Sequence, residues 1–275
     1  QSMIWANLTP SLTLTITKNC LTRPRGGDNR PVESWRLLPL ETLDGPENMA
    51  VDEAVFRETV LTGGPPTLRL YQWRRPVVTI GYGQDIDRDV NRLFCRERNI
   101  DIVRRPTGGK AVYHDADLTY ALVAPHSRPP FTADVVTTYR VIADCLIGGL
   151  EKMGITAHLA ERQCSSHNEP LKSCCFAVPF RNELLVRGAK ICGSAQLRAQ
   201  GCFLQHGSIL IDFDPAMTTR VLSKNSTDEQ EWIKYLDQAV TSLRQQIDSF
   251  SGEEDLGRCI RESFEERMGI RLQEG

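Results

Sequence analysis

One stretch of this chain decides its fold: RRPTGGKAVYHD, at residues 104–115. An apolar run at residues 100–103 precedes it and predicts a strand, and a second apolar run at 118–123 predicts a strand after it. Between the two runs, a pair of arginines, a proline and a pair of glycines interrupt regular structure. The stretch therefore predicts a glycine loop set between strands.

The glycine loop has the composition of an anion cradle. Gly108 and Gly109 allow backbone conformations closed to other residues, so a ligand can approach bare N–H groups. Arg104, Arg105 and Lys110 place positive charge around them. The loop could hold a phosphate, a carboxylate or a developing oxyanion, or it could be no more than a basic hairpin turn.

The patterns on both sides of this loop predict an α+β domain. Helices are expected from an N-cap at Asn48 to Gly63, and at residues 87–98, 139–153, 232–250 and 256–264. Strands are expected at residues 67–73, 77–82, 183–186, 191–197 and 203–212, with a surface loop at 158–173. Because strands and helices do not alternate in a strict βαβ rhythm, we expect a mostly antiparallel or mixed β-sheet core flanked by helices.

The length of 275 residues is enough for one large domain. Residues 1–34 lack clear periodicity, so we expect a poorly ordered N-terminal extension that begins with the remnant of a cleaved tag at residues 1–3 and contains at most a short strand at 12–17. Residues 35–275 are expected to form a single domain.

Composition excludes several classes of protein. A hydrophobic content of 40%, a charged content of 25% and a net charge of −2 are typical of a soluble globular protein and argue against nucleic acid as the main partner, although a local basic face could dock an acidic protein. No apolar run approaches the roughly 20 residues of a membrane helix, and no secretory signal is visible. Nine scattered cysteines without a C-x-x-C pair predict free thiols in a reducing cytoplasm. Five histidines without paired spacing predict no metal site.

Four residues are candidates for chemistry. Cys175 lies where a polar loop meets a strand, a place where a nucleophile is both held and reached, although an inert thiol is the commoner outcome for any single cysteine. Lys190 is flanked by small and apolar residues and could lower the pKa of a thiol or polarise a carbonyl, or it could be an exposed turn lysine. His114 and His206, at strand edges, could bind substrate or serve only the structure.

Five stretches in this order resemble the signatures of the biotin/lipoate ligase and transferase superfamily. They are MAVDEA at 49–54, TIGYGQ at 79–84, the glycine loop at 104–115, GAKICGSAQ at 188–196 and QHGSIL at 205–210, and the match runs from about Trp35 to Leu272. The resemblance implies that superfamily's catalytic-domain fold, no metal and no cofactor. It also implies substrate-binding roles for Tyr82, Arg105, Thr107, Gly108, Gly109, Lys110, His114, Ser194 and Ala195.

Within the superfamily, the chain looks most like octanoyltransferases of the LipM type. The peptide CFAVP at 175–179 is similar to the C-F-x-x-P context of their cysteine, and the motif lysine follows 15 residues later (190 − 175 = 15). The Gly-Gly-Lys of the loop also resembles their G-G-[RK], and the accessory C-terminal domain of many ligases is expected to be absent. One departure is Cys174, which adjoins Cys175 and leaves the choice of cysteine to the following Phe176.

This resemblance implies a reaction in lipoate biosynthesis. Octanoyl-acyl carrier protein would donate octanoate to Cys175 as a thioester, Lys190 would assist, and a lysine of a lipoyl domain, such as the glycine cleavage H protein, would accept it. An ATP-dependent lipoate-protein ligase and a LipL-type amidotransferase acting between lipoyl domains stay open, as does a binding module that has lost the chemistry. Donor preference, acceptor and oligomeric state are not decided by the sequence.

Overall fold

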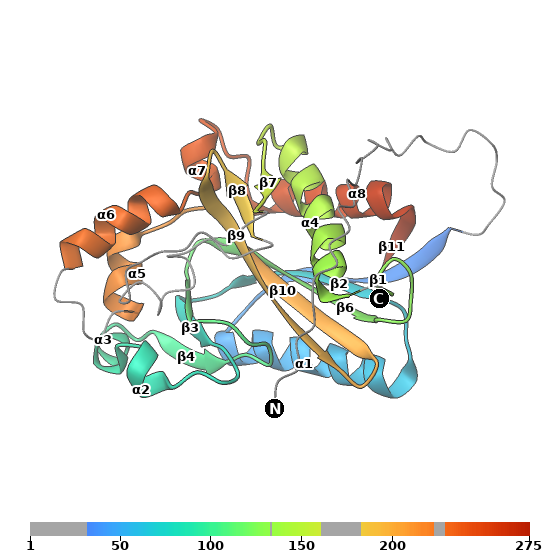
Figure 1. Cartoon of the computed structure of the whole chain (residues 1–275), viewed down its shortest axis with the longest axis horizontal. Coiled ribbons are helices and arrows are strands. Elements are labelled where there is room, and N and C mark those ends of the chain that lie inside the picture. Colours follow the sequence, from blue (N-terminus) through green and yellow to red (C-terminus); the bar gives the residue numbers. More distant parts are fainter. Residues whose placement is uncertain (1–31, 133, 161–182, 223–228) are drawn as a thin grey trace, which may run out of the picture. The chain divides into compact units, whose positions relative to one another are not determined.

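The computed structural model describes residues 32–132, 134–160, 183–222 and 229–275, which belong to the compact unit Val32–Gly275 (Figure 1). Its strands are β1 (Glu33–Leu43), β2 (Thr67–Trp73), β3 (Val77–Ile80), β4 (Asp101–Arg104), β5 (Val112–His114), β6 (Asp117–Pro125), β7 (His158–Leu159), β8 (Leu184–Val186), β9 (Ala189–Ala199), β10 (Cys202–Leu210) and β11 (Ile270–Glu274). Its helices are α1 (Gly45–Thr62), α2 (Ile86–Asp89), α3 (Arg92–Glu97), α4 (Val135–Lys152), α5 (Pro215–Leu222), α6 (Glu229–Ala239), α7 (Leu243–Gln246) and α8 (Glu253–Met268). None of the helices in these ranges has the length and apolar character needed to cross a membrane.

An eight-stranded sheet in the order β11-β1-β2-β6-β10-β9-β8-β7 carries the unit. Strand β1 runs parallel to both β2 and β11, whereas the pairs β2–β6, β6–β10, β10–β9, β9–β8 and β8–β7 are antiparallel. A second sheet has the order β4-β3-β5, with β3 parallel to β4 and antiparallel to β5. The expected α+β class with a mixed sheet is confirmed.

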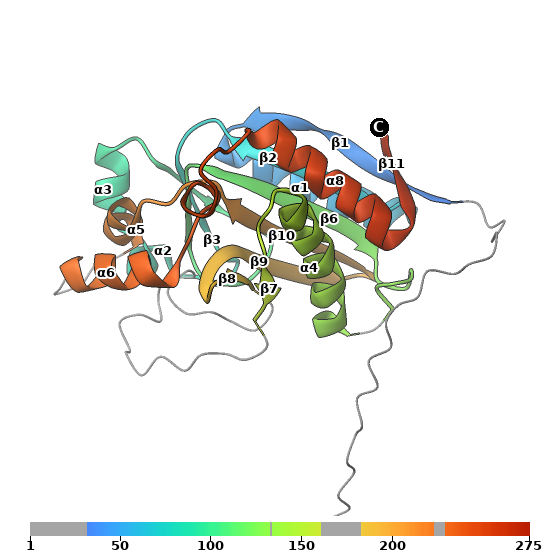
Figure 2. The ribbon, with the colours of Figure 1, turned by 90° about the horizontal axis from the view of Figure 1, so that it is seen from above.

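Helices α4 and α8 lie side by side over one face of the large sheet (Figure 2). Successive residues of a strand point to opposite faces, and Leu118, Tyr120 and Leu122 of β6 bury their side chains against this helical layer. Gly149 of α4 lets the two helices approach closely. A Cβ atom there would lie 2.4 Å from Cδ1 of Ile260 on α8 and 2.9 Å from its Cα.

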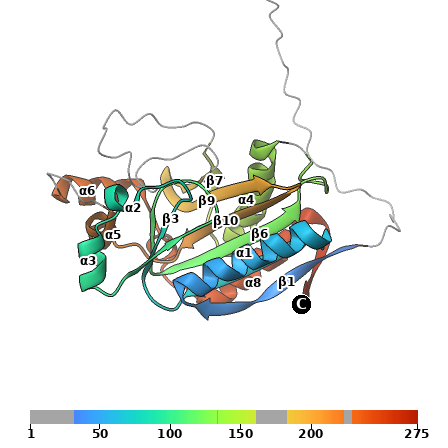
Figure 3. The ribbon, with the colours of Figure 1, turned by 90° about the horizontal axis from the view of Figure 1, so that it is seen from below.

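Helix α1 covers the opposite face of the large sheet (Figure 3). Met49 and Val55 on its buried side pack in one apolar cluster with Ala121 and Val123, the alternate residues of β6, and with Leu204 of β10. Strand β6 therefore packs against α4 and α8 on one face and against α1 on the other. The face under α1 also carries polar side chains such as Thr119.

The glycine loop joins β4 to β5, which are the two edge strands of the small sheet. Because β3 lies between them, the loop crosses over the end of β3 and is not a hairpin turn, so the simpler alternative is wrong. The backbone N–H of Tyr82, just after β3, donates to the carbonyl of Thr107 at 2.9 Å, and that of Arg105 donates to the carbonyl of Ile80 at 2.9 Å.

Three helix predictions differ from the structure. Helix α1 begins at Gly45 with Asp44 as its N-cap, because Glu47 completes a capping box, while Asn48 is buried and binds other segments. The helix expected at 87–98 is two helices, because Val90 between them is extended and fully buried.

The helix expected at 232–250 is also interrupted. It ends at Ala239, and the chain resumes as α7 behind a capping box at Ser242. Between the two helices, Val240 forms a bridge to Lys190 and the N–H of Thr241 donates to the carbonyl of Lys190 at 2.9 Å. The contact with Lys190 therefore interrupts the helix, although the apolar residues at 232–250 have continuous helical spacing.

Four strands were not expected: β1, β5 within the glycine-loop stretch, β7 inside the segment assigned to a surface loop, and β11 at the C-terminal end of the described chain. Strands β7 and β11 are short and lie at opposite edges of the large sheet. The expectation for the extension at residues 1–34 falls, up to residue 31, outside the described residues.

The contact between α4 and α8 can be tested with Gly149→Ala. Alanine normally favours a helix by about 1 kcal/mol over glycine, but here its methyl group would press on Ile260. We expect the free energy of unfolding to fall by about 1–3 kcal/mol, as for overpacking. The control is Gly257→Ala on α8, whose Cβ would meet only Leu70 at 3.6 Å and should be neutral or stabilising. Equal effects of the two changes in urea denaturation would contradict the close-packing argument.

Candidate active site

A narrow cavity of about 70 Å³ lies among the glycine loop, α1 and the strands β2, β6, β9 and β10. Its walls are mostly apolar, and Met49, Tyr71, Trp73 and Val112 contribute to them. Strand β9 adds Lys190 and the backbone-rich segment 193–195. Apolar atoms make up most of the exposed wall, although polar side chains such as Thr119, His206 and Ser208 also line it, and such a wall suits an aliphatic ligand with one reactive end.

Arg105 holds the glycine loop in shape. Its guanidinium is buried and donates to the carbonyls of Gly108 at 2.8 Å and Lys110 at 2.7 Å, and to the carbonyl of Thr79 at 3.2 Å. The guanidinium thereby joins two carbonyls of the loop to a carbonyl of β3. Gly109 takes a left-handed conformation with φ +92°, and a Cβ there would lie 2.9 Å from Nη2 of Arg105.

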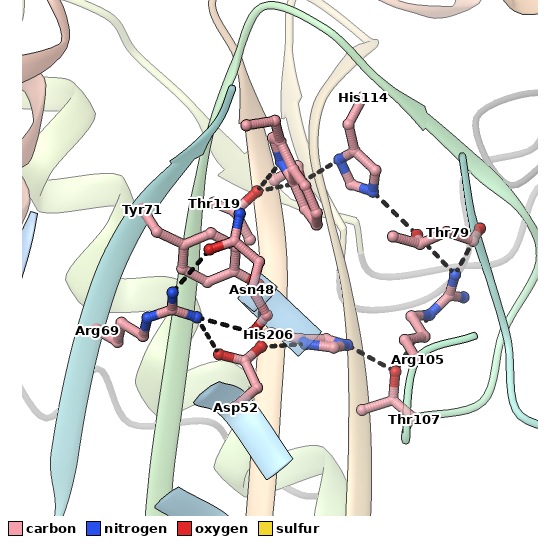
Figure 4. A network of polar contacts seen from close by, with 12 residues as sticks. Asn48, Asp52, Arg69, Tyr71, Thr79, Arg105, Thr107, His114, Thr119 and His206 are labelled. Atoms are coloured by element: carbon pink, nitrogen blue, oxygen red, sulfur yellow. Dashed lines mark hydrogen bonds and ion pairs between the residues drawn. The ribbon is translucent and has the colours of Figure 1, made fainter. Parts of the chain in front are cut away.

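A buried polar network ties the loop to α1 (Figure 4). The carboxylate of Asp52 accepts from Nη1 of Arg69 at 2.7 Å, from the hydroxyl of Tyr71 at 2.9 Å and from Nδ1 of His206 at 3.0 Å. On the other side of the imidazole ring, Nε2 of His206 lies 2.7 Å from Oγ1 of Thr107. All five side chains are almost fully buried.

The network determines the protonation of His206. Burial lowers the pKa of its imidazole below the ordinary value, even though Asp52 acts in the opposite direction. The neutral ring therefore keeps its proton on Nδ1, because Asp52 is an acceptor only, and its Nε2 accepts from the hydroxyl of Thr107. Burial and the charge of Asp52 also raise the pKa of Tyr71 well above its ordinary range, so its hydroxyl stays a donor.

A second histidine forms part of the cavity wall. Nδ1 of His114 lies 2.7 Å from Oδ2 of Asp117, its Nε2 lies 2.9 Å from Oγ1 of Thr79, and its ring stacks on Trp73 with 4.3 Å between centroids. Each ring nitrogen has a protein partner. His114 therefore presents a fixed ring face to the cavity.

Lys190 lies at the cavity wall with no exposed surface, and its Nζ is 2.5 Å from Oε1 of Glu183. Among the described cysteines, only Cys192 lies next to this pair, and burial raises the pKa of its thiol to about 12, which keeps it neutral. Cys175 lies outside the described residues. No group of three or more His, Cys, Asp or Glu within the described ranges is arranged to hold a metal ion.

The structure brings together seven of the residues expected at the site. The cavity is lined by Arg105, Gly109, His114, Lys190, Ser194, Ala195 and His206. Thr107, Gly108 and Lys110 belong to the loop but do not line this cavity, and the exposed Tyr82 lies in a groove on the outer side of the loop.

Several residues at the site were not singled out from the sequence. Asp52, Arg69, Tyr71 and Trp73 form the network and the wall, and Glu183 pairs with Lys190. The sequence did contain one signal for this network. Arg69 lies inside the apolar strand expected at 67–73, and a buried arginine requires an acidic partner, which Asp52 on the preceding helix could supply.

The sequence matches the lipoyl protein ligase A/B catalytic domain over residues 44–265. It is 38% identical over 248 residues to octanoyltransferase LipM of Kyrpidia tusciae, covering 89% of this chain and 90% of that protein. It is 33% identical to octanoyltransferase LipM of Bacillus subtilis, over 88% of each chain.

Two solved structures are similar to this fold. Lipoate-protein ligase A bound with ATP is 26% identical, with a TM-score of 0.68 over 88% of each chain. The lipoate protein ligase Ta0514 of T. acidophilum, described as putative and solved with bound lipoic acid, is 25% identical, with a TM-score of 0.70 over 88% of each chain.

The conformation of the glycine loop can be tested by a pair of adjacent substitutions. Gly109→Ala forces an L-residue into a left-handed conformation against Arg105, so we expect the free energy of unfolding to fall by about 1–3 kcal/mol. Gly108→Ala places its Cβ in open space and should change stability by no more than about 0.5 kcal/mol. Thermal and urea denaturation provide the measurement. A larger loss for the Gly108 variant would refute the described loop.

The neutral state of His206 predicts a pH dependence of stability. Its pKa is lowered in the folded protein, so below about pH 6.5 the unfolded chain binds a proton that the folded chain does not. This group should therefore lower the free energy of unfolding as the pH falls from about 6.5 towards 5, by up to about 1.4 kcal/mol per pH unit.

We expect His206→Gln to reduce this decline, whatever its effect on stability at neutral pH, whereas the same change at the exposed His158 should leave the decline intact. Parallel urea titrations at several pH values compare the slopes. An unchanged slope for His206→Gln would mean that the buried ring is not held neutral.

Proposed function

Because this chain belongs to the lipoyl protein ligase A/B catalytic-domain family, we propose that it is an octanoyltransferase that moves an eight-carbon acyl group onto a lysine of a lipoyl domain. Relatives named octanoyltransferase LipM, one of them matching nine tenths of its own length, support the reaction. The structural observation that carries the proposal is the cavity, whose apolar walls suit an acyl chain and whose wall holds the buried Lys190.

The acyl group is supplied already activated and is carried by Cys175. This assignment is supported by the sequence CFAVP at 175–179 and by its spacing of 15 residues to Lys190 (190 − 175 = 15). Transfer from the thioester of octanoyl-acyl carrier protein to a cysteine exchanges one thioester for another, so the step is nearly thermoneutral and needs no ATP. The thiolate is the attacking species.

The second step forms an amide. The amine of a lipoyl-domain lysine, such as that of an H protein, attacks the acyl-cysteine carbonyl, the C–S bond breaks, and the amide product is more stable than the thioester. Lys190 and backbone N–H groups near Gly109 and 193–195 are the donors proposed for the oxyanion of the tetrahedral intermediate. The free thiol that the first step requires and the second step regenerates fits a reducing cytoplasm.

An ATP-dependent lipoate ligase is the second candidate, favoured by the structural similarity to lipoate-protein ligase A bound with ATP. Such an enzyme would bind free octanoate or lipoate in the same cavity and activate it as an adenylate. A LipL-type amidotransferase would share the cysteine but take its acyl group from another lipoyl domain.

The acyl-enzyme itself is the sharpest test. The protein is mixed with octanoyl-acyl carrier protein in the absence of acceptor and weighed by mass spectrometry. We expect an octanoyl adduct on the wild type and on Cys174→Ala, and none on Cys175→Ala. An adduct that survives in Cys175→Ala, or that is lost only in Cys174→Ala, would overturn the assignment of the nucleophile.

The donor separates the candidates. Octanoylation of an apo-lipoyl domain by octanoyl-acyl carrier protein without ATP supports the transferase. Product formed only from free octanoate with ATP would favour the ligase, and product formed only from an octanoylated lipoyl domain would favour the amidotransferase.

A further inference from the structure

Glu183 and Lys190 form a buried ion pair across a β-hairpin. Glu183 immediately precedes β8, Lys190 is the second residue of β9, and the register shifts between Leu184 and Leu185. The carboxylate oxygen and the ammonium nitrogen lie 2.5 Å apart, and the side chains are 6% and 0% exposed. Such a pair keeps its charges only while both partners are present, because an unpaired charge at such a depth is strongly unfavourable.

The neighbouring backbone leaves room for the lysine side chain. A Cβ atom at Gly193 would lie 2.8 Å from Cε of Lys190, 2.9 Å from its Nζ and 3.8 Å from Oε1 of Glu183. The absence of a side chain at this one position allows the ammonium to lie at the cavity wall, where 193–195 also contribute. The backbone of Lys190 is held in turn by Val240 and Thr241.

Cys192 and Asp117 are two further titratable groups in the neighbourhood of the pair. Cys192 on the same strand is a buried thiol that is influenced by both Lys190 and Glu183, and Asp117 on β6 acts on it from farther away. The segment packed on the other side, 240–242, contains no ionisable side chain. Among these groups, Glu183 is the anion in direct contact with the ammonium.

We propose that Glu183 is a positioning residue that keeps Lys190 protonated and fixed at the cavity wall, so that Lys190 acts as a cation towards the acyl carbonyl and not as a proton acceptor. This inference rests on the proposed transferase function. A carboxylate in contact favours the charged form of a lysine, whereas burial without one favours the neutral form. Of the two roles open to Lys190, the geometry supports electrostatic stabilisation of the oxyanion.

The test compares Glu183→Gln, which keeps size and removes charge, with Glu183→Asp, which keeps charge. The rate of acyl-enzyme formation from octanoyl-acyl carrier protein is measured from pH 6 to pH 10. For Glu183→Gln we expect the loss of activity at alkaline pH to begin at least about one pH unit lower than in the wild type, with a rate at pH 8 reduced about tenfold or more. Glu183→Asp should shift the profile less, in the same direction.

A matched control is Glu266→Gln, which removes the carboxylate from the exposed pair of Lys152 and Glu266, 2.8 Å apart. It should leave the profile unchanged. An unchanged profile in Glu183→Gln, or a faster reaction at neutral pH, would overturn the proposal, because the second result would identify the neutral amine of Lys190 as the active form.

A measurement that does not need the reaction separates this inference from the proposed function. The Cε resonance of Lys190 in protein labelled with ¹³C-lysine, assigned through its loss in Lys190→Arg, is titrated in the wild type and in the Glu183 variants. We expect the titration midpoint of Lys190 to fall by about one pH unit or more in Glu183→Gln, and by less in Glu183→Asp. If Glu183→Gln does not fold, the shift in Glu183→Asp provides the test. An unchanged midpoint would refute the role of Glu183 even if the acyl adduct forms, whereas a missing adduct in the wild type would refute only the transferase.

Discussion

The carboxylate of Asp52 is the contact on which the site depends. It receives three donors from two strands, Arg69 and Tyr71 on β2 and His206 on β10, while its own helix lies across both strands. Because a carboxylate that is buried this completely must be fully paired, the helix, the strands and the donors can meet in only one arrangement. Through His206 the same arrangement reaches Thr107 and fixes the glycine loop. The cavity is therefore bounded by groups whose positions are determined together.

The position of Lys190, the second buried charge, depends on an interruption of the helix expected at 232–250. The helical pattern at 232–250 is interrupted where Val240 and Thr241 bind the backbone of Lys190. The strand is thereby held from the side away from Glu183, and Gly193 leaves space for the ammonium. Interrupting the helix expected at 232–250 removes helical hydrogen bonds, but it lets Val240 and Thr241 hold the backbone of Lys190 at the cavity wall.

The two faces of the large sheet differ in the side chains that they carry. The face under α4 and α8 is packed with leucine, isoleucine and aromatic side chains. The face under α1 alternates apolar residues with Thr119, His206 and Ser208, which line the cavity. An apolar layer on one side thus stabilises strands whose other side is free to carry polar groups.

The sequence by itself determined the α+β class, most helices and strands, and the loop at 104–115, because hydrophobic periodicity and glycine are local signals that act over a few residues. It also pointed to His114, Lys190 and 194–195, because their motifs are contiguous. Only the tertiary structure decided that Asp52 meets His206, 154 positions later, that Glu183 pairs with Lys190, and that α6 ends before Val240. These contacts join segments whose local patterns are independent of each other, and only the packing of α1 and the strands into one core places the charges within bonding distance.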